Sequence, residues 1–346
     1  MHQLACKPDS FFASTTTPAC ALPSRRRALG LAAALGAGLL LAGGAASAAG
    51  FPERAVTVVV PYAPAGGVDI VTRLVTTPMA EFLGQSIVVE NKPGGGTNIG
   101  MAAVARSAPN GYTLLTASNT LTTNKALYSK LSFDPATDLI PVGRIGEAPL
   151  VVVVNAKSPY KSLAELIAAG KAKPGALSYG TAGVGSSGHM ASALLEKAGQ
   201  FKGVHIPYKG GSTAVTDLLG GRLDFMAINP LEVAGHVNSG NLRALAVLNK
   251  NGSRLLPQVP SARSLGVDVQ ATVWWGLVAP KGTPEAVIQT LSAALNKALT
   301  TPAVTQTLAD MGATPLGGTP AQFGSFIQAE TRELGDVIRA ADIRAD

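Results

Sequence analysis

Short apolar runs alternate along the chain with longer stretches in which apolar residues recur at helical spacing. Ala55–Tyr62 reads AVTVVVPY and Leu150–Asn155 reads LVVVVN. Runs of this length that are rich in β-branched residues predict buried strands. By the same pattern we expect strands at Ser86–Glu90, Tyr112–Thr116, Leu177–Gly180, Gly203–Tyr208, Asp224–Ile228, Leu242–Leu248 and Val273–Ala279.

Helical patterns fill most of the segments between these strands. Ser162 opens one of them and Glu165 follows three residues later, which is the spacing of a capping box. We expect helices at Ile70–Phe82, Ile99–Ser107, Ser162–Ala172, His189–Ala198, Ala214–Leu219, Pro284–Leu299, Pro302–Met311 and Pro320–Ala340. Strands that alternate with helices predict an α/β protein with a mainly parallel sheet.

The N-terminal segment has a different character. Three arginines, Arg25–Arg27, precede an apolar run at Ala28–Leu41, and small residues then lead to Ala46–Ala48. This order predicts a secretory signal peptide over residues 1–48, cleaved near Ala48, and hence export to the periplasm. The apolar run is shorter than the roughly 20 residues of a membrane span. The arginines fit both the general secretory route and the twin-arginine route, so both remain open.

Removal of this segment would leave a chain with two lobes and no cysteine. Cys6 and Cys20 both precede the cleavage point, which excludes disulfides and thiolate chemistry in the mature protein. The roughly 300 remaining residues exceed what one hydrophobic core usually holds. We expect lobe 1 at residues 49–150 and 272–346 and lobe 2 at residues 151–271. Two strands that cross between the lobes would form a hinge, with the ligand in the crevice between them.

Charge narrows the class of ligand. The formal net charge of the chain is +7, and Lys7 with three arginines against Asp9 places +3 of it in residues 1–48. The remaining +4 is spread without a basic block. This distribution suits a small anion and argues against nucleic acid as a partner.

The first candidate for anion binding follows the first strand. Its sequence is PYAPAGGVD, and we define Tyr62–Asp69 as the first loop. Glycines let backbone N–H groups approach a ligand, and the N-terminus of the following helix adds partial positive charge. The candidate ligand contacts here are Tyr62, Ala65, Gly66, Gly67 and Asp69. Asp69 lies four residues before Arg73, so helix stabilisation is the favoured alternative role for it.

The second candidate has the same position in lobe 2. The sequence GTAGVGSSGH follows a predicted strand, and we define Thr181–Ser187 as the second loop. Its candidate ligand contacts are Thr181, Gly183, Val184, Gly185, Ser186 and Ser187, of which the serines could cap a helix or donate to a carboxylate. The glycines spell G-x-G-x-x-G, but the next strand ends in Pro207-Tyr208-Lys209 without the acid that a dinucleotide needs.

Four further candidates, Asn98, Ser118, Tyr208 and Asn229, lie in a Gly-rich loop or directly after predicted strands. Trp274 and Trp275, on the returning strand, are expected to pack. The three histidines after the signal, His189, His205 and His236, show no metal-ligand spacing. Neither G-x-S-x-G nor a catalytic carboxylate pair occurs. We therefore expect no cofactor, no metal and no catalysis.

Several of these motifs together resemble the Bug receptors, the TctC-type extracytoplasmic binding subunits of tripartite tricarboxylate transporters. PYAPAGGVDIVTR, ENKPGGGTNIG, GTAGVGSSGHM, PYKGG, DLLGGRLDFMAIN and WWGLVAPKGTP occur in the family's order over the whole chain from Phe51. The resemblance implies a type II periplasmic-binding fold that closes on a small carboxylate. It also implies delivery of that carboxylate to membrane permease subunits by a monomeric receptor.

The resemblance also assigns roles within the two loops. Backbone amides of the first and second loops would hold one carboxylate, with ordered waters at the other end of the ligand. The family reads P-G-G where this chain has Ala65-Gly66-Gly67, so Ala65 is expected to offer one extra N–H donor. A sensory protein for a membrane kinase would have the same fold and site and remains an alternative. Dicarboxylates, tricarboxylates, amino acids and aromatic acids are all compatible ligands.

Overall fold

The computed structural model describes residue 14, residues 50–340 and residues 342–345. Apart from Ser14, the predicted signal peptide lies outside the described residues. Within these ranges no helix combines the length and the apolar character that a membrane crossing would require.

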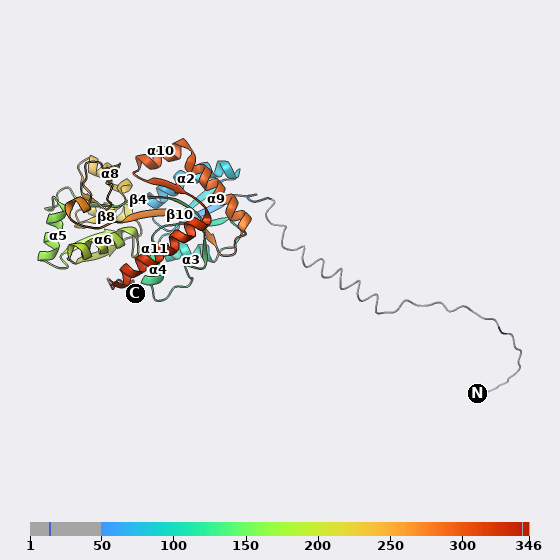
Figure 1. The fold of residues 1–346 in the computed structure, drawn as a ribbon, viewed down its shortest axis with the longest axis horizontal. Helices are drawn as coiled ribbons and strands as arrows, with labels where there is room; N and C mark the ends of the chain where they lie inside the picture. The colour runs from blue at the N-terminus through green and yellow to red at the C-terminus, as the bar shows by residue number, and fades with distance from the viewer. Residues whose placement is uncertain (1–13, 15–49, 341, 346) are drawn as a thin grey trace, which may run out of the picture. The chain divides into compact units, whose positions relative to one another are not determined.

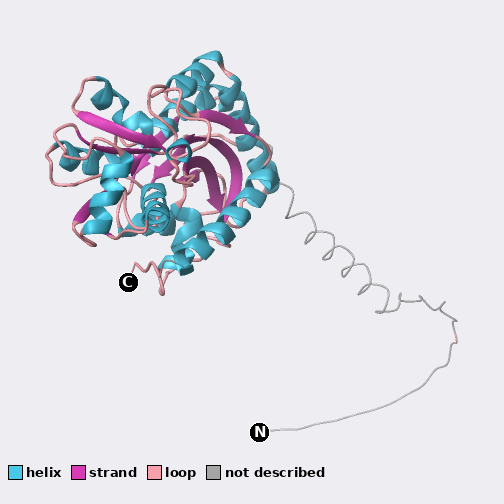
Figure 2. Ribbon diagram, turned by 60° about the vertical axis from the view of Figure 1, so that its left-hand side comes forward, coloured by secondary structure: helices cyan, strands magenta, loops and turns pink. Residues whose placement is uncertain are grey.

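A six-stranded sheet organises the first lobe, with the strand order β11-β4-β10-β3-β1-β2. Helices pack around its strands (Figures 1 and 2). The strands are β1 Val56–Val60, β2 Ile87–Asn91, β3 Thr113–Ala117, β4 Leu139–Pro149, β10 Thr272–Pro280 and β11 Thr314–Gly317. The helices are α2 Gly67–Leu83, α3 Asn98–Ala105, α4 Thr120–Leu127, α9 Glu285–Thr300, α10 Pro302–Asp310 and α11 Pro320–Ala340, with a 3-10 turn η2 at Gly95–Thr97.

The second lobe is built on shorter strands. One sheet has the order β8-β5-β9, and β6 pairs with β7. A bridge between Tyr179 and Phe225 connects the two sets. The strands are β5 Val151–Asn155, β6 Leu177–Thr181, β7 Gly203–Pro207, β8 Met226–Ile228 and β9 Leu242–Val247. The helices are α5 Leu163–Ala172, α6 Ser187–Gly199, α7 Gly211–Leu219 and α8 Pro230–Asn238, with a 3-10 turn η3 at Arg263–Leu265.

The prediction of a mainly parallel sheet is wrong, because the strands that join the lobes run in opposite directions. The pairs β1–β2, β1–β3 and β6–β7 are parallel. In contrast, β10 runs antiparallel to β3 and β4, and β5 runs antiparallel to β8 and β9. Strand β4 leads the chain out of the first lobe and β10 brings it back, so the two must oppose each other.

These two crossings form the predicted two-strand hinge. The chain leaves the six-stranded sheet at Leu150 and returns to it after Ala271. The Leu150 N–H donates to the Ala271 carbonyl at 3.1 Å, and the Ala271 N–H donates to the Leu248 carbonyl at 2.8 Å. Leu248 in turn donates to the Leu150 carbonyl at 2.7 Å. Three backbone bonds therefore tie the crossing segments together at the place where the lobes meet.

Candidate functional site

A small cavity of about 50 Å³ lies where the lobes meet, and we call it the inner cavity. The first residues of α2, α6, α7 and α8 line it together with side chains from the strand ends: Tyr62, Gly66, Gly67, Ser118, Ser186, Ser187, Gly211, Asn229, Glu232 and Trp275. It has room for a few waters at about 10–15 Å³ each. The backbone N–H groups at helix N-termini have no partner within their own helix, so this cavity is surrounded by potential donors.

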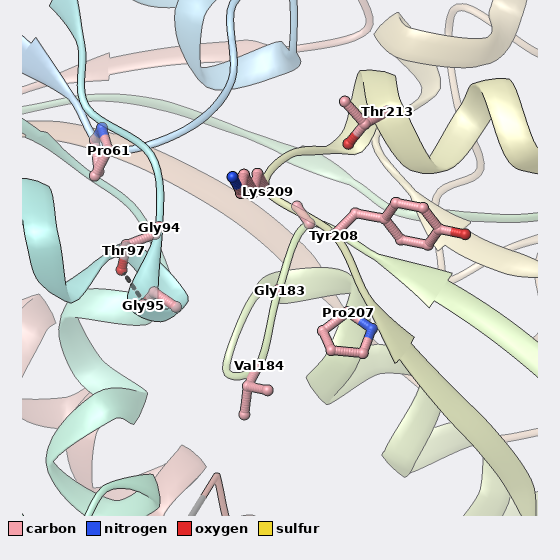
Figure 3. A pocket seen from close by; sticks show the side chains of 12 residues that line it. Pro61, Gly94, Gly95, Thr97, Gly183, Val184, Pro207, Tyr208, Lys209 and Thr213 are labelled. Atoms are coloured by element: carbon pink, nitrogen blue, oxygen red, sulfur yellow. Dashed lines mark hydrogen bonds between the residues drawn. The ribbon is translucent and has the colours of Figure 1, made fainter.

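A larger cavity of about 520 Å³ lies beside it, and we call it the outer cavity. Figure 3 shows the loop at Gly94–Thr97 on one side and Gly183, Val184 and the segment Pro207–Lys209 on the other. Ala182 lines both cavities, so they are neighbouring parts of one cleft. The outer cavity is in the range of about 300–1,000 Å³ that small-molecule sites occupy.

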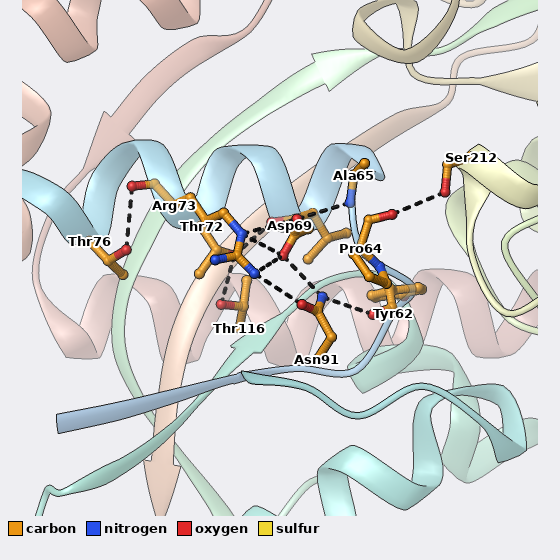
Figure 4. Close-up of polar contacts among 11 residues, drawn as sticks. Tyr62, Pro64, Ala65, Asp69, Thr72, Arg73, Thr76, Asn91, Thr116 and Ser212 are labelled. Carbon is orange, nitrogen blue, oxygen red and sulfur yellow. Dashed lines mark hydrogen bonds and ion pairs between the residues drawn. The ribbon is translucent and has the colours of Figure 1, made fainter. Parts of the chain in front are cut away.

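Asp69 holds the first loop in shape (Figure 4). Its carboxylate accepts the Ala65 N–H at 2.9 Å, the Arg73 Nε–H at 3.0 Å and the Asn91 amide at 3.0 Å. Burial alone would raise the pKa of Asp69, but these bonds lower it below its ordinary value. Asp69 therefore stays ionised, and the structure uses it to stabilise the loop.

Ala65 corrects one expectation. Its φ of 60° lies in the left-handed region that favours glycine. The bond to Asp69 stabilises that conformation and occupies the N–H that was expected to face the ligand. The prediction of an extra donor from Ala65 is therefore wrong. Neither Ala65 nor Asp69 lines the inner or the outer cavity.

Tyr62 forms part of the wall of the inner cavity. Its hydroxyl lies 3.0 Å from the Thr120 hydroxyl, and the ring is buried. Burial raises the pKa of Tyr62 to about 12. The phenol is therefore neutral at physiological pH and acts as a hydrogen-bonding group beside Ser118.

The second loop is shaped by its own side chains. The Thr181 hydroxyl accepts the Gly183 N–H at 3.2 Å and lies 2.6 Å from His205 Nε2. His189 Nδ1 accepts the Gly185 N–H at 3.2 Å, and the His189 and His205 rings stack with centroids 3.9 Å apart. Burial, and after it the nearby His205, lowers the pKa of His189 to about 3. Burial lowers the pKa of His205 to about 4. Both rings are therefore neutral and shape the loop.

The two serines of this loop have different surroundings. Ser186 is the N-cap of α6, where its side chain accepts the His189 N–H at 3.4 Å. Ser187 borders the inner cavity, and within residues 50–340 its hydroxyl has no hydrogen-bond partner. The structure thus separates capping and potential ligand contact, which the sequence left open for both residues.

Asn229 and Trp275 present buried donors at the inner cavity. Asn229 caps α8 through its Oδ1, which accepts the Leu231 N–H at 3.1 Å. The Asn229 Nδ2 and the Trp275 Nε1 have no hydrogen-bond partner among the described residues. Both residues are buried, since Asn229 is 4% exposed and Trp275 is 1% exposed. An unsatisfied buried donor is costly, so both groups call for an acceptor supplied from elsewhere. Trp274 packs against Phe323 and Phe326, as expected.

Glu232, in the first turn of α8, is the charged lining residue that the sequence reasoning missed. It lies three residues after Asn229, so the sequence suggests an ordinary capping box. Its carboxylate instead accepts the Gly67 N–H at the start of α2. Burial raises the pKa of Glu232 to about 7, although this bond opposes the shift. Its Oε2 is buried without a partner among the described residues.

Two other candidates use their side chains within the protein. Asn98 accepts the Asn124 amide at 2.8 Å beside the outer cavity. The Tyr208 hydroxyl donates to Asp217 at 2.6 Å, and its ring extends away from the Gly94–Thr97 loop in Figure 3. Burial, and then Asp217, raises the pKa of Tyr208 to about 12. The backbone of Tyr208, and not its side chain, is therefore available to a ligand.

Hydrogen bonds span the cleft between the lobes. The Ala63 N–H donates to the Lys209 carbonyl at 3.0 Å, and the Ser212 hydroxyl donates to the Pro64 carbonyl at 3.2 Å. On the other side of the cleft, the Thr123 hydroxyl donates to the Gly185 carbonyl at 2.9 Å. These bonds join each loop to the opposite lobe, so the structure represents a closed conformation. No group of three or more potential metal ligands occurs in the described part of the chain.

Comparison with known proteins gives a consistent result. The family model described as "Tripartite tricarboxylate transporter family receptor" matches residues 71–343. BugT of Bordetella pertussis is 38% identical over 314 residues, which cover 89% of this chain and 96% of BugT.

Solved structures agree with this match. MatC from Rhodopseudomonas palustris with bound malate is 32% identical, with a TM-score of 0.79 over 83% of this chain and 100% of MatC. Rpa4515 of R. palustris with adipate is 31% identical, with a TM-score of 0.82 over 85% of this chain and 99% of that one. The predicted type II periplasmic-binding fold, with two α/β lobes, is thereby confirmed.

Proposed function

The chain belongs to the tripartite tricarboxylate transporter family of receptors, and from this premise we propose that it captures a small carboxylate between its lobes and delivers it to the membrane permease subunits of such a transporter. Members of the family are periplasmic binding proteins. We accordingly assign residues 1–48 to a signal peptide that directs export to the periplasm, and we propose that the mature receptor acts as a monomer.

One observation supports carboxylate capture above the others. Two buried donors, Asn229 Nδ2 and Trp275 Nε1, face the inner cavity without a partner among the described residues. The N-termini of α2 and α6 reach the same cavity from opposite lobes. A carboxylate provides acceptors for all of these groups, and charged acceptors form the stronger hydrogen bonds.

The division into lobes suggests how binding is signalled. We propose that residues 49–150 and 272–346 move as one body and residues 151–271 as another, about the crossings at Leu150 and Ala271. A ligand that touches both lobes favours the closed form, because only that form makes both sets of contacts. The closed receptor is then the form that the permease subunits would recognise.

Carboxylate binding has support in the relatives, since malate and adipate are the acids bound by MatC and Rpa4515. The family consists of receptors that bind solutes, and we propose that this chain likewise releases its ligand unchanged. Incubation of the protein with a bound carboxylate, followed by recovery of the ligand and mass analysis, tests this point. A chemically altered ligand would contradict it.

A thermal-shift series tests carboxylate capture directly. The protein, purified from the periplasm of expressing cells, is heated with malate, adipate, citrate or glutamate and, as matched controls, with the corresponding amides. Ligands that bind the folded state stabilise it by mass action and so raise the melting temperature. At a ligand concentration a hundredfold above Kd, the stabilisation is about 2.7 kcal/mol. We expect a rise with at least one acid and none with its amide. Equal shifts with acid and amide, or none with any acid, would contradict the proposal.

A further inference from the structure

Glu232 introduces a negative charge into a site that is otherwise made of donors. Among the described residues that line the inner cavity, it is the single charged side chain, and Tyr62 is the single other titratable group. Its Oε2 lies so close to Gly211 that a Cβ there would collide with it, and a Cβ on Gly67 would lie 3.1 Å from Oε1. The carboxylate is thus enclosed between the starts of α2 and α7.

The surrounding helices set the charge that this site can accept. Four helices of nine or more residues begin at the inner cavity: α2, α6, α7 and α8. Each N-terminus is equivalent to roughly half a positive charge, so the four together offer about two. An ionised Glu232 neutralises about one of these. The remaining field matches a ligand with a net charge of about −1, and it would leave about one charge of a −2 ligand uncompensated.

The hydrogen-bond inventory points the same way. The unpaired groups of Asn229 and Trp275 are donors, and they require acceptor oxygens on the ligand. The unpaired Oε2 of Glu232 is an acceptor when the carboxylate is ionised, and it requires a donor. A dicarboxylate offers only acceptors, so it would leave Oε2 unsatisfied unless Glu232 first took up a proton. A ligand that combines a carboxylate with an ammonium group satisfies both requirements.

We propose that Glu232 is the specificity-determining residue of this site and that it selects a carboxylate ligand that also bears an ammonium group over a plain dicarboxylate. The ligand carboxylate pairs with Asn229 and Trp275, and its ammonium group pairs with Glu232. This inference rests on the proposed function, because it names the ligand class of the same site.

Matched pairs of ligands test the proposal by titration calorimetry. Aspartate is compared with succinate, glutamate with glutarate, and 2-aminoadipate with adipate, so that each pair differs by one ammonium group. We expect at least one amino acid to bind at least tenfold more tightly than its dicarboxylate. If the dicarboxylate binds as tightly or more tightly in every pair, the inference fails and the proposed function stands. If no acid binds at all, both fail.

Two variants separate the role of Glu232 from general effects on the fold. Glu232→Gln keeps the shape of the side chain but cannot be ionised. It should weaken the amino acid at least tenfold and strengthen the paired dicarboxylate. Glu81→Gln, on the exposed face of α2, is the matched control and should leave both affinities unchanged. If Glu232→Gln leaves the ratio within each pair unchanged, the inference is wrong.

Proton exchange provides a readout that needs no variant. Glu232 and Tyr62 are the titratable side chains that face this cavity within the described chain, and Tyr62 stays protonated at neutral pH. Binding of an ammonium group to Glu232 should release protons near pH 7, whereas binding of a dicarboxylate should take them up. Titrations in buffers with different ionisation enthalpies measure the sign. Proton uptake with the amino acid would overturn the proposal.

Discussion

The Gly67 N–H donates to the Glu232 carboxylate, so a side chain from α8 of the second lobe covers the N-terminus of α2 in the first. The two residues also lie beside Asn229, whose Nδ2 would be 2.9 Å from a Cβ on Gly67. A helix N-terminus is a ready site for an anion. The protein's own carboxylate thus takes one of the N–H groups that the sequence assigns to a ligand carboxylate.

The first prediction concerns the stability of the ligand-free protein. Burial raises the pKa of Glu232 from 4.5 to about 7, so the folded protein holds this proton more tightly than the unfolded chain does. Its contribution to stability is therefore present at low pH and is lost as the pH rises from about 4.5 to about 7. Glu232→Gln should raise the melting temperature relative to wild type at pH 8 by more than at pH 5. An equal difference at both pH values would contradict the pKa shift.

The second prediction tests the approach of the first loop to the ligand. A valine at position 67 would project between Asn229 and Glu232 and fill the inner cavity. The φ of Gly67 is not in the positive region, so steric filling, and not backbone strain, is the expected cause. Gly67→Val should lower the affinity for the tightest carboxylate by at least tenfold in titration calorimetry.

The control for this variant is Gly235→Val, on the exposed side of α8, where a Cβ meets no atom within 4 Å. This variant makes the same Gly-to-Val change within a helix, and it should bind the carboxylate with wild-type affinity. Near-wild-type affinity of Gly67→Val would show that the start of α2 does not contact the ligand.

Much of the fold could be predicted, because apolar runs mark the strands and glycines mark the turns that follow them. Strand β1 is a continuous apolar run, and the two glycines after it mark the turn into α2. Strand β4 escaped prediction, since Pro141, Gly143, Gly146 and Pro149 interrupt its eleven residues and resemble turn signals. It is stable as a strand because β10 and β11 pair with it on both sides. Helices α4 and α8 and strand β11 were also missed.

The candidate site likewise contains residues that could be predicted from the sequence and residues that could not. Residues at strand ends, such as Tyr62, Ser118 and Asn229, were predicted from position alone, and all three line the inner cavity. Glu232 could not be predicted this way, because the local pattern with Asn229 favours a helix cap. Its partner, Gly67, is 165 positions away in the sequence. Only the packing of the two lobes brings the residues together.

The third prediction assigns separate roles to the two serines of the second loop. Ser186 caps α6, so Ser186→Ala should lower stability by roughly 1 kcal/mol with and without ligand. Ser187 faces the inner cavity, so Ser187→Ala should weaken carboxylate binding by about 1.5–3 kcal/mol, tenfold or more, with little change in the ligand-free melting temperature. Melting and titration of both variants measure this. If both serines only affect melting, the second loop binds through backbone amides alone.

The last prediction concerns closure. The Thr123 hydroxyl lies 2.9 Å from the Gly185 carbonyl across the cleft and 3.2 Å from the Asn119 carbonyl within its own helix turn, and its single O–H can donate to either. Thr123→Val removes the bond between the lobes and leaves a buried carbonyl without that donor, at a cost of about 1 kcal/mol to the closed form. The open form should therefore be more populated at a given ligand concentration.

Small-angle scattering during a titration with the tightest carboxylate measures this change. In the wild type the radius of gyration should decrease as ligand saturates the protein. Thr123→Val should need about fivefold more ligand for the same decrease, which corresponds to about 1 kcal/mol. Thr122→Val is the matched control, since the Thr122 hydroxyl donates to Asn119 within the same lobe. If the two variants contract at the same ligand concentration, the bond from Thr123 to Gly185 does not stabilise closure. If the wild type does not contract at all, the lobes do not close on this ligand.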